Sequence, residues 1–223
     1  DLTLCRVSHG IVAQIQNRGT DSVGGDEFDQ LLVRHVRDMH RAEHGLAADI
    51  PEVEGAAQKL LAECEEAKIA LSERDASTVF VANFLHTDGP GAVLEQTVTR
   101  ATLLEVAGHL VDEGLSLIDL LLESAGVNKQ SVALCLATGG MVNMPMIRER
   151  LEEQFGPQRV PGIENGERII AEGAAWIAAD ERRLTLSKPI ELLHADDSWV
   201  PMMAEGVELP TLGTTQQVNL SMY

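Results

Sequence analysis

The chain has 223 residues, of which 44% are hydrophobic and 23% charged, and its formal net charge is −18. Such a composition is typical of a globular protein with room for one large domain or two modest ones. The acidic charge repels nucleic-acid backbones, and an aromatic content of 3% leaves few rings for base stacking. No apolar run reaches the roughly 18–20 residues that a membrane-spanning helix needs. We therefore expect neither a nucleic acid nor a membrane as a partner.

The three cysteines, Cys5, Cys64 and Cys135, lie far apart and form no CxxC pair. An odd and unpatterned set is typical of reduced thiols in a cytosolic protein. Each cysteine belongs to an apolar repeat, so we expect all three to be buried. The chain begins with Asp1 instead of methionine and shows no secretion signal, which predicts a cytoplasmic fragment of a longer protein.

Two β-like runs open the chain at residues 2–7 and 11–16, and the turn at 8–10 predicts that they form a hairpin. A helix is predicted to follow the glycine pair before Asp26 and to end at Gly45. The acidic residues Asp26, Glu27 and Asp29 lie in its first turns, where they favour the positive end of the helix dipole.

A second helix is predicted to begin at Pro51, because proline is favoured in a first helical turn, and apolar residues keep helical spacing as far as Leu71. The pattern then changes. Residues 77–85 and 91–99 are rich in β-branched and aromatic side chains, and the segment between them is rich in turn formers. We expect these two runs to be strands.

A long helix is predicted at 101–125, with Thr102 and Glu105 as its capping box. The next run, residues 132–137, is short and continuously apolar. A strand covered on both faces is its expected state, and such strands belong to α/β layers.

The glycine pair Gly139-Gly140 follows this expected strand, and Pro145 then begins a helix. Strand, glycine turn and helix N-terminus together can hold an anion or a nucleotide, because the backbone N–H groups are accessible. Taken alone, an ordinary connecting turn is the commoner interpretation. The pair is not a Walker loop and lacks the third glycine of a Rossmann fingerprint.

Two further features alter that balance. Gly24-Gly25 also precedes a helix, and Lys68 and Ser72 lie four residues apart on one helix face. A lysine at such spacing is usually a solvated ion-pair partner. The combination of these features in this order is more specific than any of them alone.

Five segments resemble, in order and spacing, the seventy-kilodalton heat-shock chaperones of the DnaK type: GGDEFDQLLVRHV, CEEAKIALS, TVTRATLLE, LATGGMVNMP and AEGAAWIAA. The resemblance covers about residues 1–180. It implies an α/β fold, the second lobe of an actin-like ATPase with a ribonuclease-H-like sheet and helices. The implied core is 1–23 and 99–185, the inserted helix and hairpin subdomain is 24–98, and 186–223 holds the linker and the start of a β-rich substrate-binding region.

The resemblance further implies that the chain lines one side of an ATP or ADP site and contributes to ATP-driven protein folding in the stress response. By this resemblance, the turn near the phosphates is Gly24 and Gly25. The helix face toward ribose and adenine consists of Glu65, Lys68 and Ser72. The adenosine loop consists of Gly139, Gly140, Met141 and Asn143, and the acid near the nucleoside is Glu167. The family takes its hydrolytic groups from parts that this chain does not match. We therefore expect no catalytic residue, no metal ligand and no ATP turnover here, with magnesium bound only in the complete protein.

Met141 and Asn143 depart from the family pattern, which usually has a serine and an arginine at these positions. The arginine packs on adenine, and its loss removes a contact worth about 0.5–2 kcal/mol. Met141 still offers a polarisable apolar surface. We expect weakened or altered nucleotide affinity.

The partners implied by the resemblance are the first ATPase lobe of the same chain, unfolded client peptides, a J-domain co-chaperone and a nucleotide-exchange factor. Two alternatives stay open. One is a chaperone-like interaction module that is nucleotide-inactive, which Met141 and Asn143 favour. The other is a bacterial actin-like filament protein, against which the CEEAKIALS helix argues. A zinc site at His40 and His44 lacks further ligands nearby and is not favoured.

Overall fold

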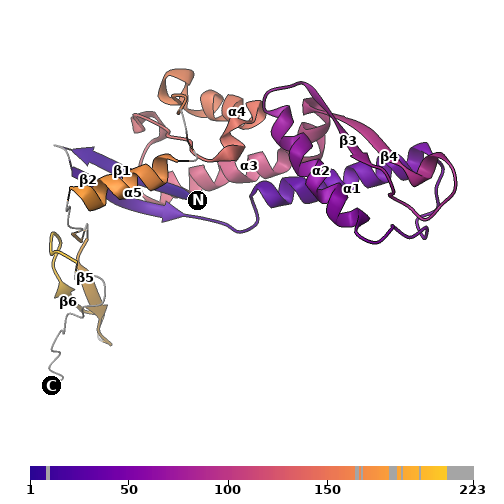
Figure 1. The fold of residues 1–223 in the computed structure, drawn as a ribbon. Coiled ribbons are helices and arrows are strands. Elements are labelled where there is room, and N and C mark those ends of the chain that lie inside the picture. Colours follow the sequence, from indigo (N-terminus) through magenta and orange to yellow (C-terminus); the bar gives the residue numbers. More distant parts are fainter. Residues whose placement is uncertain are drawn as a thin grey trace. The chain divides into compact units, whose positions relative to one another are not determined.

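The structure is a computed structural model that describes residues 1–8, 11–163, 166, 168–180, 185–186, 188–195 and 197–209 (Figure 1). The chain forms two compact units. Unit 1 comprises Asp1–Leu2 and Arg18–Glu167, and unit 2 comprises Thr3–Asn17 and Arg168–Tyr223. No helix in the described part of the chain is both long and apolar enough to cross a membrane.

Helix α1 (Gly25–Glu43) begins at the predicted glycine pair. Asp26 and Glu27 lie in its first turn, where the positive end of the helix dipole stabilises their charges. Gly45 follows the helix with φ of 61°, a left-handed conformation that suits glycine and ends helices. Both predicted ends of this helix are confirmed.

Helix α2 (Ala56–Leu71) begins later than expected, and the prediction that Pro51 starts it is wrong. The residues after Pro51 are extended instead, and the Val53 N–H donates to the Phe84 carbonyl at 2.9 Å. Gly55, with φ of 78°, is the N-cap residue. A contact with a distant loop has therefore replaced the first turn that proline alone would favour.

Strands β3 (Ala76–Val81) and β4 (Leu94–Thr99) form the predicted antiparallel hairpin. Ala76 lies opposite Thr99 at one end of the register and Val81 opposite Leu94 at the other. A single turn of 3₁₀ helix, η1 (Pro90–Ala92), lies in the connection.

Helix α3 (Arg100–Ser124) is the predicted long helix, but its cap lies one turn earlier than expected. The Thr99 hydroxyl accepts a hydrogen bond from the Thr102 N–H at 3.1 Å, and the Thr102 hydroxyl accepts one from the Thr99 N–H at 3.3 Å. The predicted box of Thr102 and Glu105 is therefore wrong. Because β4 continues directly into the helix, Thr99 is the last extended residue and takes the capping position.

The core of unit 1 lies among α1, α2, α3 and the β3–β4 hairpin, which contact one another (Figure 1). Apolar side chains from all of these elements meet there. The largest with almost no exposure are Phe28, Leu32, Val36, Leu60, Leu71, Val79, Val81, Phe84, Leu94, Val98 and Leu103. This core fixes the relative positions of α1 and α2, on which the candidate site depends.

Residues 132–137 do not form the predicted strand. The strands within the described residues make three two-stranded sheets, and none of them includes this segment. Its Cys135 N–H donates to the Arg159 carbonyl at 2.7 Å, but Leu134 and Leu136 are 56% and 63% exposed. A strand needs a neighbour along its edge to form a ladder, so an apolar run without one stays irregular.

Short helical segments complete unit 1. They are η2 (Lys129–Ser131), η3 (Gly140–Asn143), α4 (Pro145–Phe155) and η4 (Pro157–Arg159). Pro145 occupies the first turn of α4, as predicted, where its missing N–H costs no hydrogen bond.

Strands β1 (Leu2–Ser8) and β2 (Ile11–Arg18) pair with each other, which confirms the first predicted hairpin; part of its turn lies outside the described residues. Helix α5 (Ile169–Ala179) buries none of its residues, and Ile170 and Trp176 are 71% and 74% exposed.

The tail of unit 2 contains β5 (Ile190–Leu193) and β6 (Trp199–Met203), which pair antiparallel. An isolated bridge joins Thr185 to Glu208. A short β-rich tail was expected here, and the described part of it has this character.

The three thiols differ in exposure, so the prediction that all are buried is wrong for Cys5. Cys64 is buried, Cys135 is intermediate and Cys5 is exposed, because Cys5 lies on the face of β1 opposite to Leu2 and Leu4. Burial raises the pKa of the Cys64 thiol to about 12, and burial also raises the pKa of Cys135.

We expect a thiol reagent to modify Cys5 first, Cys135 more slowly, and Cys64 only when unit 1 unfolds. The thiolate is the reactive form, and burial suppresses both its formation and its contact with reagent. Mass spectrometry of peptides after timed labelling at neutral pH measures the three rates. Labelling of Cys64 as fast as Cys5 in native buffer would contradict the burial of the Cys64 side chain.

Candidate functional site

Three separate segments of unit 1 meet at the first turn of α1. A Cβ atom placed on Gly25 would lie 3.2 Å from the Lys68 ammonium on α2 and 3.5 Å from the Met141 sulfur in η3. The first distance is tighter than ordinary van der Waals contact, so a residue without a side chain allows this close approach. The structure thus brings together one member of each predicted group of site residues.

Lys68 is paired in this structure, but the pair is buried instead of solvated. Its Nζ donates to Asp29 Oδ2 at 2.6 Å and to the Gly25 carbonyl at 3.1 Å. The Lys68 and Asp29 residues are only 7% and 4% exposed. The second carboxylate oxygen, Asp29 Oδ1, is also buried and has no hydrogen-bond partner among the described residues.

The electrostatic surroundings of Asp29 favour its neutral form. Burial has the largest effect and raises the pKa of this carboxyl group. The hydrogen bond and charge of Lys68 oppose that rise, while the negative charges of Glu65 and Asp26 add to it. The Lys68 ammonium is therefore the nearby group that opposes the rise in pKa and favours the charged form of this carboxyl group.

The second glycine bend is open to solvent. Gly139 has φ of 99°, in the left-handed region, and both Gly139 and Gly140 are exposed. Gly166 lies against this bend, because a Cβ placed on it would be 3.7 Å from the Gly139 nitrogen and 3.9 Å from the Thr138 Cα. The loop therefore presents accessible backbone next to Gly166, which directly precedes the predicted acid Glu167 in the sequence.

The other predicted residues occupy varied positions. Gly24 is the extended N-cap residue of α1, with no side-chain cap. Glu65 is exposed one turn before Lys68, and Ser72 is the C-cap residue of α2. Asn143 is exposed at the end of η3.

One predicted site residue, Glu167, lies outside the described residues.

The sequence interpretation missed the role of Asp29, which it assigned to the helix dipole alone. A usable signal was present, because Asp29 shares helical spacing with Val33, Val36 and His40, all of which are buried. A carboxylate on an apolar stripe needs a buried cation, and Lys68 supplies it.

His40 is a core residue of α1. It is fully buried, its Nε2 lies 3.0 Å from the Gly91 carbonyl oxygen, and its ring packs edge-on against Phe84 and His44. Among the described residues, no group of three or more side chains is arranged to hold a metal ion.

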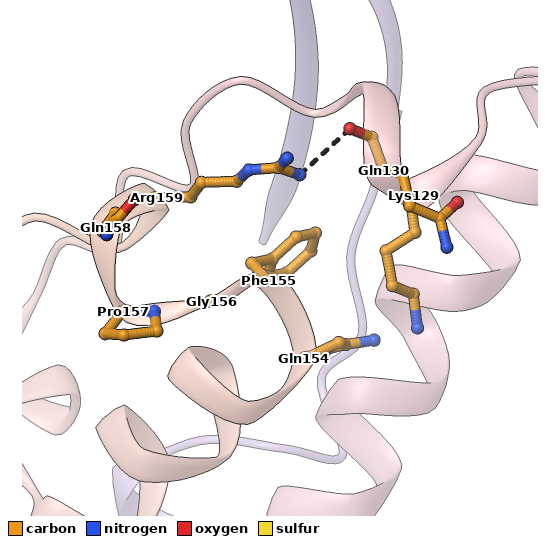
Figure 2. Close-up of a pocket in the computed structure, with 8 residues that line it drawn as sticks. All are labelled: Lys129, Gln130, Gln154, Phe155, Gly156, Pro157, Gln158 and Arg159. Atoms are coloured by element: carbon orange, nitrogen blue, oxygen red, sulfur yellow. Dashed lines mark hydrogen bonds between the residues drawn. The ribbon is translucent and has the colours of Figure 1, made fainter.

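A separate hollow of about 430 Å³ lies at the end of α4 (Figure 2). It is lined by Lys129, Gln130, Gln154, Phe155, Gly156, Pro157, Gln158 and Arg159. Both of its cations are already engaged: Lys129 Nζ lies 2.6 Å from Asp119 Oδ1, and Arg159 Nη1 donates to the Gln130 carbonyl at 3.0 Å. The hollow contains none of the predicted site residues.

The described residues form a mixed α/β structure, and comparison with known proteins gives the family. A model of the family described as Hsp70 protein matches residues 1–191. The chaperone protein DnaK of Halobacterium salinarum is 32% identical over 157 residues, which are 70% of this chain and 24% of that protein. The DnaK proteins of Thermotoga petrophila and Thermotoga neapolitana are 30% identical over 182 residues, which are 80% of this chain and 30% of each.

The chain therefore belongs to the Hsp70 family, and the resemblance noted from its motifs is confirmed. Membership implies the actin-like ATPase fold, with which the mixed α/β structure is consistent. The chain spans between 24% and 30% of the length of these relatives.

Proposed function

We propose that this chain is part of the nucleotide-binding lobe of a heat-shock-type chaperone and lines one side of an adenine nucleotide site. The observation that carries the proposal is the meeting of Gly25, Lys68 and Met141. These residues come from three segments that resemble the phosphate turn, the ribose-facing helix and the adenosine loop of the family. The Lys68 ammonium and the Met141 sulfur lie 3.2 Å and 3.5 Å from the position that a Cβ atom on Gly25 would occupy.

The residues present fit such a ligand. The N-terminus of α1 offers unpaired backbone N–H groups and a positive dipole end, which suit a phosphate. The exposed backbone at Gly139 and Gly140 permits close approach of a nucleoside, and Met141 offers it a polarisable apolar surface. Glu65 and Ser72 would face the ribose hydroxyls.

In the complete protein we propose ATP hydrolysis with magnesium, supported by family membership. The catalytic groups and the metal ligands would come from the first lobe. Unfolded client peptides, a J-domain co-chaperone and a nucleotide-exchange factor are the proposed partners, and the cytoplasm is the proposed location. Family membership does not favour the actin-like filament alternative.

Changing Gly140 to aspartate tests the site. We expect ADP and ATP to bind the complete protein and Gly140→Asp to weaken that binding at least about tenfold, because the new carboxylate adds bulk and repels an anionic ligand. Titration calorimetry measures the dissociation constants.

Gly173→Asp is the matched control, because it adds the same charge at a glycine of α5 that has open space around it. We expect it to bind nucleotide as the wild type does. A complete protein that binds no nucleotide at millimolar concentration would instead support the nucleotide-inactive interaction module.

A further inference from the structure

We propose that Asp29 is a positioning residue for nucleotide binding, which acts by holding the Lys68 ammonium at the first turn of α1. This inference rests on the proposed function and adds to it a residue outside the predicted contact set. Asp29 would act through Lys68, which donates a hydrogen bond to its carboxylate, and would not itself touch the nucleotide.

The contacts of Lys68 leave one donor for a ligand. An ammonium group has three N–H donors. The carboxylate of Asp29 takes one at 2.6 Å and the Gly25 carbonyl takes a second at 3.1 Å. Within the described residues the third donor has no partner. The ammonium lies beside Gly25, and the Met141 side chain lies beside the same glycine.

Holding the ammonium in this position matters because a lysine has a long and flexible side chain. Four rotatable bonds would otherwise let it sample many positions, and fixing one of them only on binding costs affinity. The buried carboxylate on the neighbouring helix fixes the ammonium before the ligand arrives. Asp29 and Lys68 are 39 residues apart in sequence, so the core between α1 and α2 sets this geometry.

The competing interpretation is that the pair only ties α1 to α2. Both interpretations expect the pair to affect stability, but only the positioning role expects Asp29 to affect nucleotide affinity through Lys68. A double-mutant cycle separates them, because a residue that acts through another has no effect once the other is removed.

The experiment measures ADP dissociation constants of the complete protein by calorimetry, for the wild type, Asp29→Asn, Lys68→Met and the double variant. We expect Asp29→Asn to weaken ADP binding about tenfold, within the usual range for coupled neighbours. We expect the double variant to bind no more weakly than Lys68→Met alone. Asp38→Asn is the control, because it removes the same charge from an exposed position further along α1, and we expect it to bind ADP as the wild type does.

A second measurement avoids the risk that Asp29→Asn fails to fold. The charged groups that act on Asp29 are Lys68 and Glu65 on α2 and Asp26 on α1, and the nearby Cys64 thiol is protonated at neutral pH. Protonation of Asp29 removes its hold on Lys68. The ADP affinity of the wild type should therefore fall as the pH is lowered toward the raised pKa of Asp29, and it should fall less steeply in Lys68→Met.

The outcomes are distinct. Unchanged ADP binding by a folded Asp29→Asn variant, fully additive effects in the double variant, or equal pH profiles for the wild type and Lys68→Met would each overturn the positioning role. If the wild type binds no ADP, the proposed function itself fails.

Discussion

Replacing Lys68 by alanine is expected to lower the free energy of unfolding by about 3–5 kcal/mol. The change leaves Asp29 charged or forces its protonation in a site that is 4% exposed, and Asp29 Oδ1 already has no hydrogen-bond partner in the described structure. An uncompensated buried charge is among the most destabilising single changes. Urea unfolding followed by circular dichroism measures the loss.

Lys59→Ala is the matched control, because Lys59 is exposed on the same helix and should cost no more than about 0.5 kcal/mol. Replacing both partners with apolar residues, Asp29→Leu with Lys68→Met, should restore much of the stability, because no buried charge remains. A loss in Lys68→Ala as small as that in Lys59→Ala would mean that the pair is solvated.

Replacing Phe84 by alanine is expected to destabilise unit 1 by about 3–5 kcal/mol, through lost burial and the cavity left behind. Phe84 is fully buried, its ring packs on His40 with centroids 5.4 Å apart, and its carbonyl accepts a hydrogen bond from Val53. The same unfolding experiment measures the effect.

Phe80→Ala supplies the comparison for this change, because Phe80 lies in β3 with 48% of its surface exposed. It should lose about 0.5 kcal/mol or less. Equal losses for the two phenylalanines would contradict the burial of Phe84 and the exposure of Phe80.

Elements with strong local signals were predicted well from the sequence. The start of α1, the length of α3 and the β3–β4 pair follow from a glycine pair, a helical apolar period and a change to β-branched residues. These signals lie within a few residues of the structure that they specify.

The wrong secondary-structure predictions concern segments whose conformation depends on contacts with residues far away in the sequence. Pro51 lies in an extended segment because Val53 pairs with the loop at Phe84, which no local rule anticipates. Residues 132–137 have the composition of a buried strand, but in the described structure no neighbouring strand pairs with them. Composition predicts that a run can form a strand, and pairing decides whether it does.

The site was predicted through family motifs instead of spacing alone. The motifs indicated that Gly25, Lys68 and Met141 face a shared ligand, and the structure places the three together; their role in nucleotide binding stays a prediction. Asp29 was missed because its partner lies on another helix. The effect of a buried carboxylate on stability depends on its cationic partner, and the residues next to Asp29 in the sequence do not identify that partner.

The positions of the two tryptophans have a practical consequence. Trp176 in α5 and Trp199 in β6 both lie in unit 2, with 74% and 60% of their surfaces exposed. Indole fluorescence of the natural chain therefore reports on unit 2 and not on the core around Phe84. An optical probe of unit 1 has to be introduced, and the half-exposed ring of Phe80 marks a position on β3 where an indole could be accommodated.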